Sequence, residues 1–194
     1  LMNVEPLTIK QVQERIDPSV TMLEYFVTSS SVYVWVVEKD RVQFVSTAIP
    51  RTDLVSKVTS LRDTIYQLSE KERFNTLSQE LHRLLIQPAL SHIRGKEIIV
   101  VPHDVLHYLP FQALLSPSGK YLIEDYPINY LSSASLMQFT QEKRKARGEL
   151  RKILAEGGNV LTFGNPDLGD PKMSLAFAGI EAKEIKSLYP QSTI

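Results

Sequence analysis

Cysteine is absent from this chain of 194 residues. Its absence excludes disulfides, thiolate zinc sites and a cysteine nucleophile within these residues. An excess of charge of either sign is also missing, because 22 basic residues balance 22 acidic ones. The composition therefore gives no overall reason to expect a nucleic acid or an acidic membrane surface as a partner.

Long hydrophobic runs are missing too. No stretch approaches the roughly 18 apolar residues that a membrane-spanning helix needs. The N-terminus lacks the basic and apolar blocks of a signal peptide. We therefore expect a cytoplasmic protein without a membrane partner.

The stretch Lys96–Leu115 contains the most informative pattern. Its apolar, β-branched run Ile98–Val101 is too short for a helix and lies between Gly95 and Pro102. Such a run predicts a strand buried on both faces, as in a parallel sheet. The polar loop that follows should lie at the carboxyl edge of the sheet, where open α/β folds bind their ligands.

The N-terminal third favours an antiparallel meander. A short helix over residues 7–17 is followed by three β-rich stretches, Met22–Thr28, Val32–Glu38 and Arg41–Thr47. The connections between them are too short for anything but hairpins, so we expect Val32–Glu38 to be the middle strand. Trp35 falls within the apolar alternation of that strand and is predicted to be a core residue.

Two amphipathic helices are predicted next. The first runs from about Asp53 to Leu68, and the second ends near Pro88, which must kink or restart it. The apolar stripe of the first helix comprises Leu54, Val58, Leu61, Ile65 and Leu68, and that of the second comprises Phe74, Leu77, Leu81, Leu84 and Leu85.

The C-terminal part alternates short strands and helices. Strands are predicted over Tyr121–Ile123 and Ile128–Leu131, and Ser132 or Ser133 can cap a helix that runs to about Lys152. Beyond these lie a candidate hinge at Gly157-Gly158, a candidate buried strand at Asn159–Phe163 and a helix from about Leu175 to Tyr189. Strand, loop and helix in that order open a βαβ unit whose second strand lies outside the chain.

Three residues of the central loop are candidates for chemistry: His103, Asp104 and His107. Two histidines four residues apart can bind a metal when they share a helix face, although Pro102 and Pro110 argue against a helix here. The pair His103-Asp104 could instead be a general base with its orienting carboxylate. We favour a third interpretation, in which both imidazoles satisfy buried backbone groups at a strand end. A base needs a nucleophile beside it, and the sequence shows no G-x-S-x-G elbow.

Two further motifs are weaker. Gly164-Asn165-Pro166 separates the last predicted strand from the last helix, where a phosphate could bind. No Walker lysine accompanies it, so we favour a plain turn. The run Lys143-Arg144-Lys145, with Arg147, Arg151 and Lys152, could contact a nucleic acid or an acidic partner. It lacks interleaved stacking aromatics, so we favour a solvated helix face and do not expect nucleic acid.

Taken together, these residues resemble the N-terminal portion of a CHAT domain, the caspase-like domain commonly fused behind TPR repeats. The most specific stretch of the resemblance is Ile99–Phe111, IVVPHDVLHYLPF. The other matching segments are Leu23–Phe26, Val34–Val37, Leu84–Pro88, Tyr121–Glu124, Tyr130–Ser133, Gly164–Pro166 and the helix with Glu181 and Glu184 that ends in Leu188-Tyr189-Pro190.

The resemblance implies a clan of cysteine proteases that includes caspases and separase. It implies an α/β fold of caspase-like three-layer architecture, with a mixed sheet, an antiparallel N-terminal meander and flanking helices, incomplete at the C-terminus. The family's catalytic histidine and cysteine lie downstream of the segment that matches Gly164–Pro190, beyond Ile194. Accordingly, we assign no catalytic, cofactor-binding or metal-binding residue to this chain, and His103, Asp104 and His107 match positions outside the catalytic pair.

The expected division is a leading, non-catalytic lobe over residues 1–150 and the truncated start of the catalytic lobe over residues 151–194. Expected partners are the rest of the CHAT domain, TPR repeats fused or bound upstream and a protein substrate of the parent. A second copy could also associate through an unpaired sheet edge at Asn159–Phe163. The alternative is a non-catalytic scaffold that docks TPR repeats or a regulator. A third hypothesis is a small-molecule hydrolase or metal site centred on His103, Asp104 and His107.

Overall fold

The computed structural model describes residues 6–67, 71–139, 164 and 174–188. It divides into two compact units, residues 1–138 and 139–194, which are described separately. No helix of the described part is both long and apolar enough to cross a membrane.

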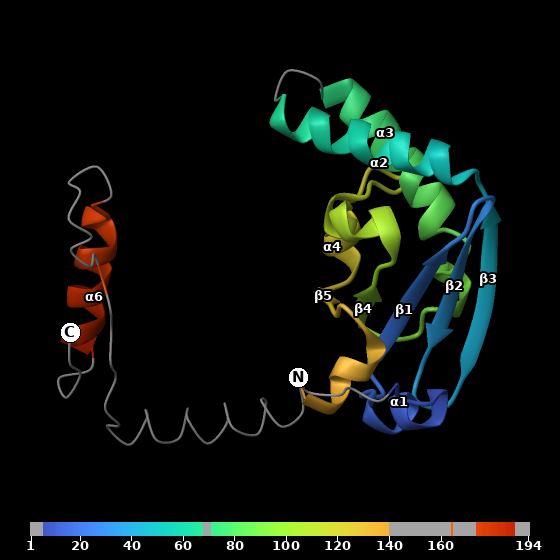
Figure 1. Ribbon diagram of the computed structural model, residues 1–194, viewed down its shortest axis with the longest axis horizontal. Helices are drawn as coiled ribbons and strands as arrows, with labels where there is room; N and C mark the ends of the chain where they lie inside the picture. Colours follow the sequence, from blue (N-terminus) through green and yellow to red (C-terminus); the bar gives the residue numbers. More distant parts are fainter. Residues whose placement is uncertain (1–5, 68–70, 140–163, 165–173, 189–194) are drawn as a thin grey trace. The chain divides into compact units, whose positions relative to one another are not determined.

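The first unit is built on a five-stranded mixed sheet (Figure 1). Its strands are β1 (Val20–Val27), β2 (Ser31–Val37), β3 (Val42–Ala48), β4 (Glu97–Val101) and β5 (Ile128–Tyr130), in the spatial order β3-β2-β1-β4-β5. β2 pairs antiparallel with both β1 and β3, which confirms the predicted meander with β2 in its middle. The fold is the predicted α/β class with a mixed sheet, while the three-layer arrangement stays a prediction.

β4 pairs parallel with β1 on one side and with β5 on the other, as its apolar run predicted. Its side chains enter two different clusters. Ile98 and Val100 belong to the main core on the first face of the sheet, and Ile99 and Val101 pack into a smaller cluster on the second face. The strand is therefore covered on both faces.

Two helices pack against the main core on the first face, α2 (Arg51–Tyr66) and α3 (Lys71–Leu85). In the view of Figure 1 they lie above the strands. Leu54, Val58 and Leu61 of α2 are fully buried against the sheet, as the stripe predicted. Ile65 was placed wrongly, because its side chain is 41% exposed and Thr64 is buried instead. The Thr64 hydroxyl can be buried since it donates to the Leu61 carbonyl oxygen.

The short helix α1 (Ile9–Arg15) packs against the second face. Thr8 begins it with a capping box, in which the Thr8 hydroxyl accepts from the backbone N–H of Gln11 and the Gln11 side chain accepts from the N–H of Thr8. Val12 and Ile16 then cover one end of the face. Trp35 packs against this cluster but is only partly buried, so it lies at the margin of the predicted core.

Short helical turns link the strands on either side of β4. After Pro88 the chain restarts as the 3₁₀ helix η1 (Leu90–His92), as the proline predicted. The predicted strand Tyr121–Ile123 was wrong, because Leu122–Asp125 forms the helix α4. Ser133 accepts from the N–H of Ser135 and so caps the 3₁₀ helix η4 (Ala134–Leu136), at the start of the predicted helix.

The second unit is described at Gly164 and along α6 (Ala176–Leu188), which confirms the last predicted helix. Gly164 lies so close to Ala178 and Ala182 of α6 that an added Cβ would overlap the helix. A glycine is needed for that approach. Several predicted features lie outside the described residues: the continuation of the helix to Lys152, the basic run, Gly157-Gly158, Asn159–Phe163 and the loop after Gly164.

Candidate functional site

The predicted loop lies at the carboxyl edge of the sheet. Because β1 and β4 are parallel, Val27 and Val101 end at the same edge. The loop leads into the 3₁₀ helix η2 (Asp104–Tyr108), and Asp104 has a positive φ of 56°. Among non-glycine residues, aspartate is one of those that tolerate this left-handed conformation best.

His103 is tied to the end of β1. Its Nδ1 accepts a hydrogen bond of 3.1 Å from the backbone N–H of Val27, and its ring lies 4.6 Å from that of Phe26. A neutral imidazole that accepts at Nδ1 carries its proton on Nε2. In this arrangement neither nitrogen is free to remove a proton from a substrate, so His103 serves to hold two strand ends together.

The Asp104 carboxylate faces a partner that the sequence did not suggest. Nε and Nη2 of Arg51 donate to its two oxygens at 2.6 and 2.8 Å. These hydrogen bonds lower the pKa of Asp104 and raise that of Arg51. Arg51 begins α2, and its N–H donates to the carbonyl oxygen of Ser29 in the β1–β2 turn. The pair thus joins α2 to the loop after β4 and leaves the aspartate charge balanced.

His107 and Tyr108 point outward from η2. Both side chains are exposed, and the guanidinium of Arg62 lies 5.1 Å from the centre of the Tyr108 ring. The structure therefore does not gather the three candidates around one point, since His103 faces β1, Asp104 faces α2 and His107 faces solvent. Among the residues that the structure describes, no group of three or more His, Cys, Asp or Glu side chains could hold a metal ion.

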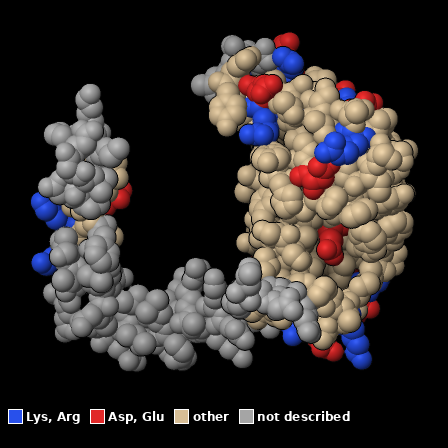
Figure 2. Space-filling model, in the orientation of Figure 1, with Lys and Arg blue, Asp and Glu red and all other residues tan. Residues whose placement is uncertain are grey.

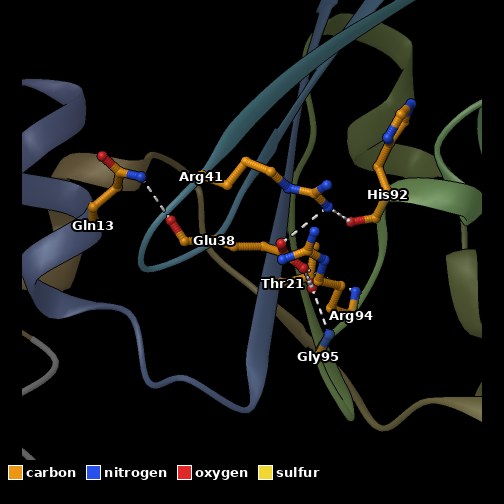
Figure 3. A network of polar contacts seen from close by, with 7 residues as sticks. All are labelled: Gln13, Thr21, Glu38, Arg41, His92, Arg94 and Gly95. Carbon is orange, nitrogen blue, oxygen red and sulfur yellow. Dashed lines mark hydrogen bonds and ion pairs between the residues drawn. The ribbon is translucent and has the colours of Figure 1, made fainter.

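A second polar cluster lies at the opposite, amino edge of the sheet (Figure 3). Glu38 is 6% exposed, and its Oε1 accepts from the Thr21 hydroxyl at 2.9 Å and from the Arg94 N–H at 2.8 Å. Arg41 donates to Oε2 at 3.2 Å and also to the His92 carbonyl oxygen at 2.9 Å. This network closes the β2–β3 hairpin onto the segment that enters β4. The Thr21 hydroxyl in turn accepts from the Gly95 N–H at 2.9 Å, 74 positions along the chain, and no sequence pattern links residues so far apart.

Charge is distributed without a dominant sign on the face seen in Figure 2, where acidic and basic side chains of the described residues are scattered among uncharged ones. Such a surface lacks the basic stripe by which proteins attract a phosphate backbone. This face gives no support to a nucleic-acid partner.

The sequence matches a known protein family. Residues 75–193 match the family model of the CHAT domain. The matched part begins inside α3 and takes in β4, the His103–Asp104 loop and α6, whereas β1, β2 and β3 precede it. A search of curated proteins found no relative that matches.

Proposed function

The chain belongs to the CHAT domain family of caspase-like domains, and from that premise we propose that it is the leading, non-catalytic part of a cysteine protease. Its sheet and helices support a catalytic histidine and cysteine that lie beyond residue 194. In the parent, the histidine activates the thiolate for attack on a peptide bond, with an oxyanion site beside it.

One observation carries the proposal: the polar groups of the central loop are engaged by the fold itself. His103 accepts from the backbone of β1, and both oxygens of Asp104 accept from Arg51. The sequence also supplies no cysteine that either could activate. The loop's polar side chains join β1, β4 and α2, which suits a supporting role.

The test compares this chain with a longer polypeptide of the same protein that includes the downstream residues. We expect the purified 194-residue chain to leave a panel of fluorogenic peptides uncleaved and the longer polypeptide to cleave them. Replacing the downstream cysteine by alanine should abolish that activity, whereas His107→Ala, which removes an exposed side chain, should leave kcat unchanged. Hydrolysis by the short chain alone, at a rate proportional to its concentration, would overturn the proposal.

A non-catalytic scaffold is the second candidate function. It is favoured by one specific observation, a partly open aromatic face on the sheet, on which Phe26 and Phe44 are 45% and 53% exposed. A scaffold needs such a surface for TPR repeats or another regulator. If the longer polypeptide proves inactive although folded, the scaffold function is the one supported.

A further inference from the structure

The second face of the sheet is covered at one end only. A small apolar cluster covers that end, comprising Val12, Ile16, Met22, Val37, Val101, Ala134 and Met137. Further along the same face, on β1, β2 and β3, aromatic side chains are exposed or only partly buried. We call the residues Glu24, Phe26, Tyr33, Trp35 and Phe44 the aromatic patch.

The register of the strands places the patch residues side by side. Glu24 lies opposite Trp35, and Trp35 lies opposite Phe44, so these three form one row across β1, β2 and β3. Phe26 and Tyr33 form the next row on the same face. The rings contact one another, with centroids 5.3 Å apart for Trp35 and Phe44 and 5.6 Å apart for Tyr33 and Phe44.

Glu24 is the charged member of the patch. Its side chain is half-buried, and burial raises the pKa of its carboxyl group. Within the described part of the chain, no donor or cation pairs with this carboxylate. A half-buried carboxylate without a partner is costly, and a cation that approached it would recover the lost interaction.

The chemistry of the patch favours an arginine among cations. Aromatic faces attract cations, and a guanidinium group can stack on a ring while donating two hydrogen bonds to a carboxylate. A lysine ammonium is a point charge that holds its water more strongly and cannot make the same planar contact. An acidic or neutral partner would leave the Glu24 charge unpaired.

We propose that the aromatic patch is a docking surface for an arginine-bearing segment of a partner protein, with the guanidinium group against Trp35 and Phe44 and paired to Glu24. The inference does not depend on the supporting role proposed above, because binding can be measured without any hydrolysis. It adds the chemistry by which a partner would be recognised.

Trp35 is the only tryptophan of the sequence, so its fluorescence reports on the patch directly. The 194-residue chain is titrated with a short synthetic peptide in which arginine and alanine alternate. Matched peptides carry lysine or citrulline in place of arginine, the latter being a neutral analogue of similar shape. We expect a saturable fluorescence change with the arginine peptide, weaker binding of the lysine peptide and the weakest binding of the citrulline peptide.

Three variants complete the experiment. Glu24→Gln keeps the shape of the side chain and should weaken arginine-peptide binding about tenfold, as expected for loss of one partly desolvated charge pair. Phe44→Ala removes an exposed ring and should weaken it similarly. Asp63→Asn removes an exposed carboxylate from α2, which covers the opposite face, and should change nothing. Circular dichroism checks that each variant is folded.

Several results would overturn the inference. Equal affinity for the arginine and citrulline peptides would show that charge is not recognised, and unchanged binding by Glu24→Gln would remove Glu24 from the surface. Absence of any saturable change would exclude the site. A fluorescence change on dilution of the protein alone, with a dimer in sedimentation, would mean that a second copy occupies the patch.

Discussion

Replacing Glu38 by alanine should destabilise the protein severely. The substitution removes the acceptor of three hydrogen bonds, from the Thr21 hydroxyl, the Arg94 N–H and Arg41. Hydrogen bonds to a charged group contribute about 1.5–3 kcal/mol each, but bonds that share one carboxylate do not add fully. Because the site is buried, the three donors left without an acceptor lose most of that energy. We therefore expect the free energy of unfolding to fall by about 3–5 kcal/mol.

Urea denaturation, followed by circular dichroism, measures this loss. Glu38→Gln retains one acceptor oxygen and should cost less, about 1–3 kcal/mol. Glu14→Ala is the matched control, because Glu14 is an exposed glutamate on α1, and its removal should change stability by less than about 0.5 kcal/mol. If Glu38→Ala cost less than about 1 kcal/mol, the carboxylate would not be organising the amino edge of the sheet, and the reasoning would be refuted.

Two further predictions concern buried positions. His82 is 2% exposed, and its Nδ1 has no hydrogen-bond partner. Burial lowers the pKa of His82, and the charge of Asp125 acts in the opposite direction without reversing the shift. The pKa of His82 is lower in the folded protein than in the unfolded chain, so unfolding takes up a proton at low pH. The free energy of unfolding should therefore fall as the pH drops below about 6.5. The free energy of unfolding should fall less with pH in His82→Gln than in the unaltered protein. Urea denaturation at several pH values measures this, and equal pH dependence in the two proteins would contradict the prediction. In Gly95→Ala, the added Cβ would lie 2.5 Å from the Thr21 nitrogen and 2.8 Å from the Ser19 oxygen, so we expect a loss of more than about 2 kcal/mol in the free energy of unfolding by the same assay. Lys96→Ala, at the exposed neighbouring position, is the comparison and should change this free energy by less than about 0.5 kcal/mol.

Local sequence patterns predicted much of the sheet. The β-branched run Ile98–Val101 indicated a buried parallel strand, and the short connections between the first three strands left only hairpins. Both patterns extend over only a few residues, and the burial of their apolar side chains stabilises the strands that they predict. The order in which β4 joins β1, and the placement of β5 beyond it, depend on packing that spacing does not encode.

Two predictions from residue type were wrong, one because of a local capping interaction and one because of the position of a residue on its helix. Tyr121–Ile123 has the aromatic and branched residues of a strand, yet the Glu124 side chain accepts from the Tyr121 N–H and begins α4. Ile65 fits an apolar stripe, but it falls at the exposed side of α2 near the end of that helix.

The position of the candidate site was predictable, but its contacts were not. Polar residues directly after a buried parallel strand must lie at the carboxyl edge, and His103 and Asp104 do. Their partners come from distant segments: Val27 lies 76 positions from His103, and Arg51 lies 53 positions from Asp104. No pattern in the sequence links residues so far apart, and the same holds for Glu24, whose surroundings became clear only from strand register.

The parallel pairing of β1 with β4 has a practical consequence for how the protein is produced. The family match starts at residue 75, whereas β1 lies upstream of it. A truncated clone designed on the match alone would remove the strand that hydrogen-bonds to one side of β4, and with it Leu23 and Tyr25, which share the main core with Ile98 and Val100. Such a fragment should aggregate through its bare strand, so the smallest stable piece must begin upstream of Val20.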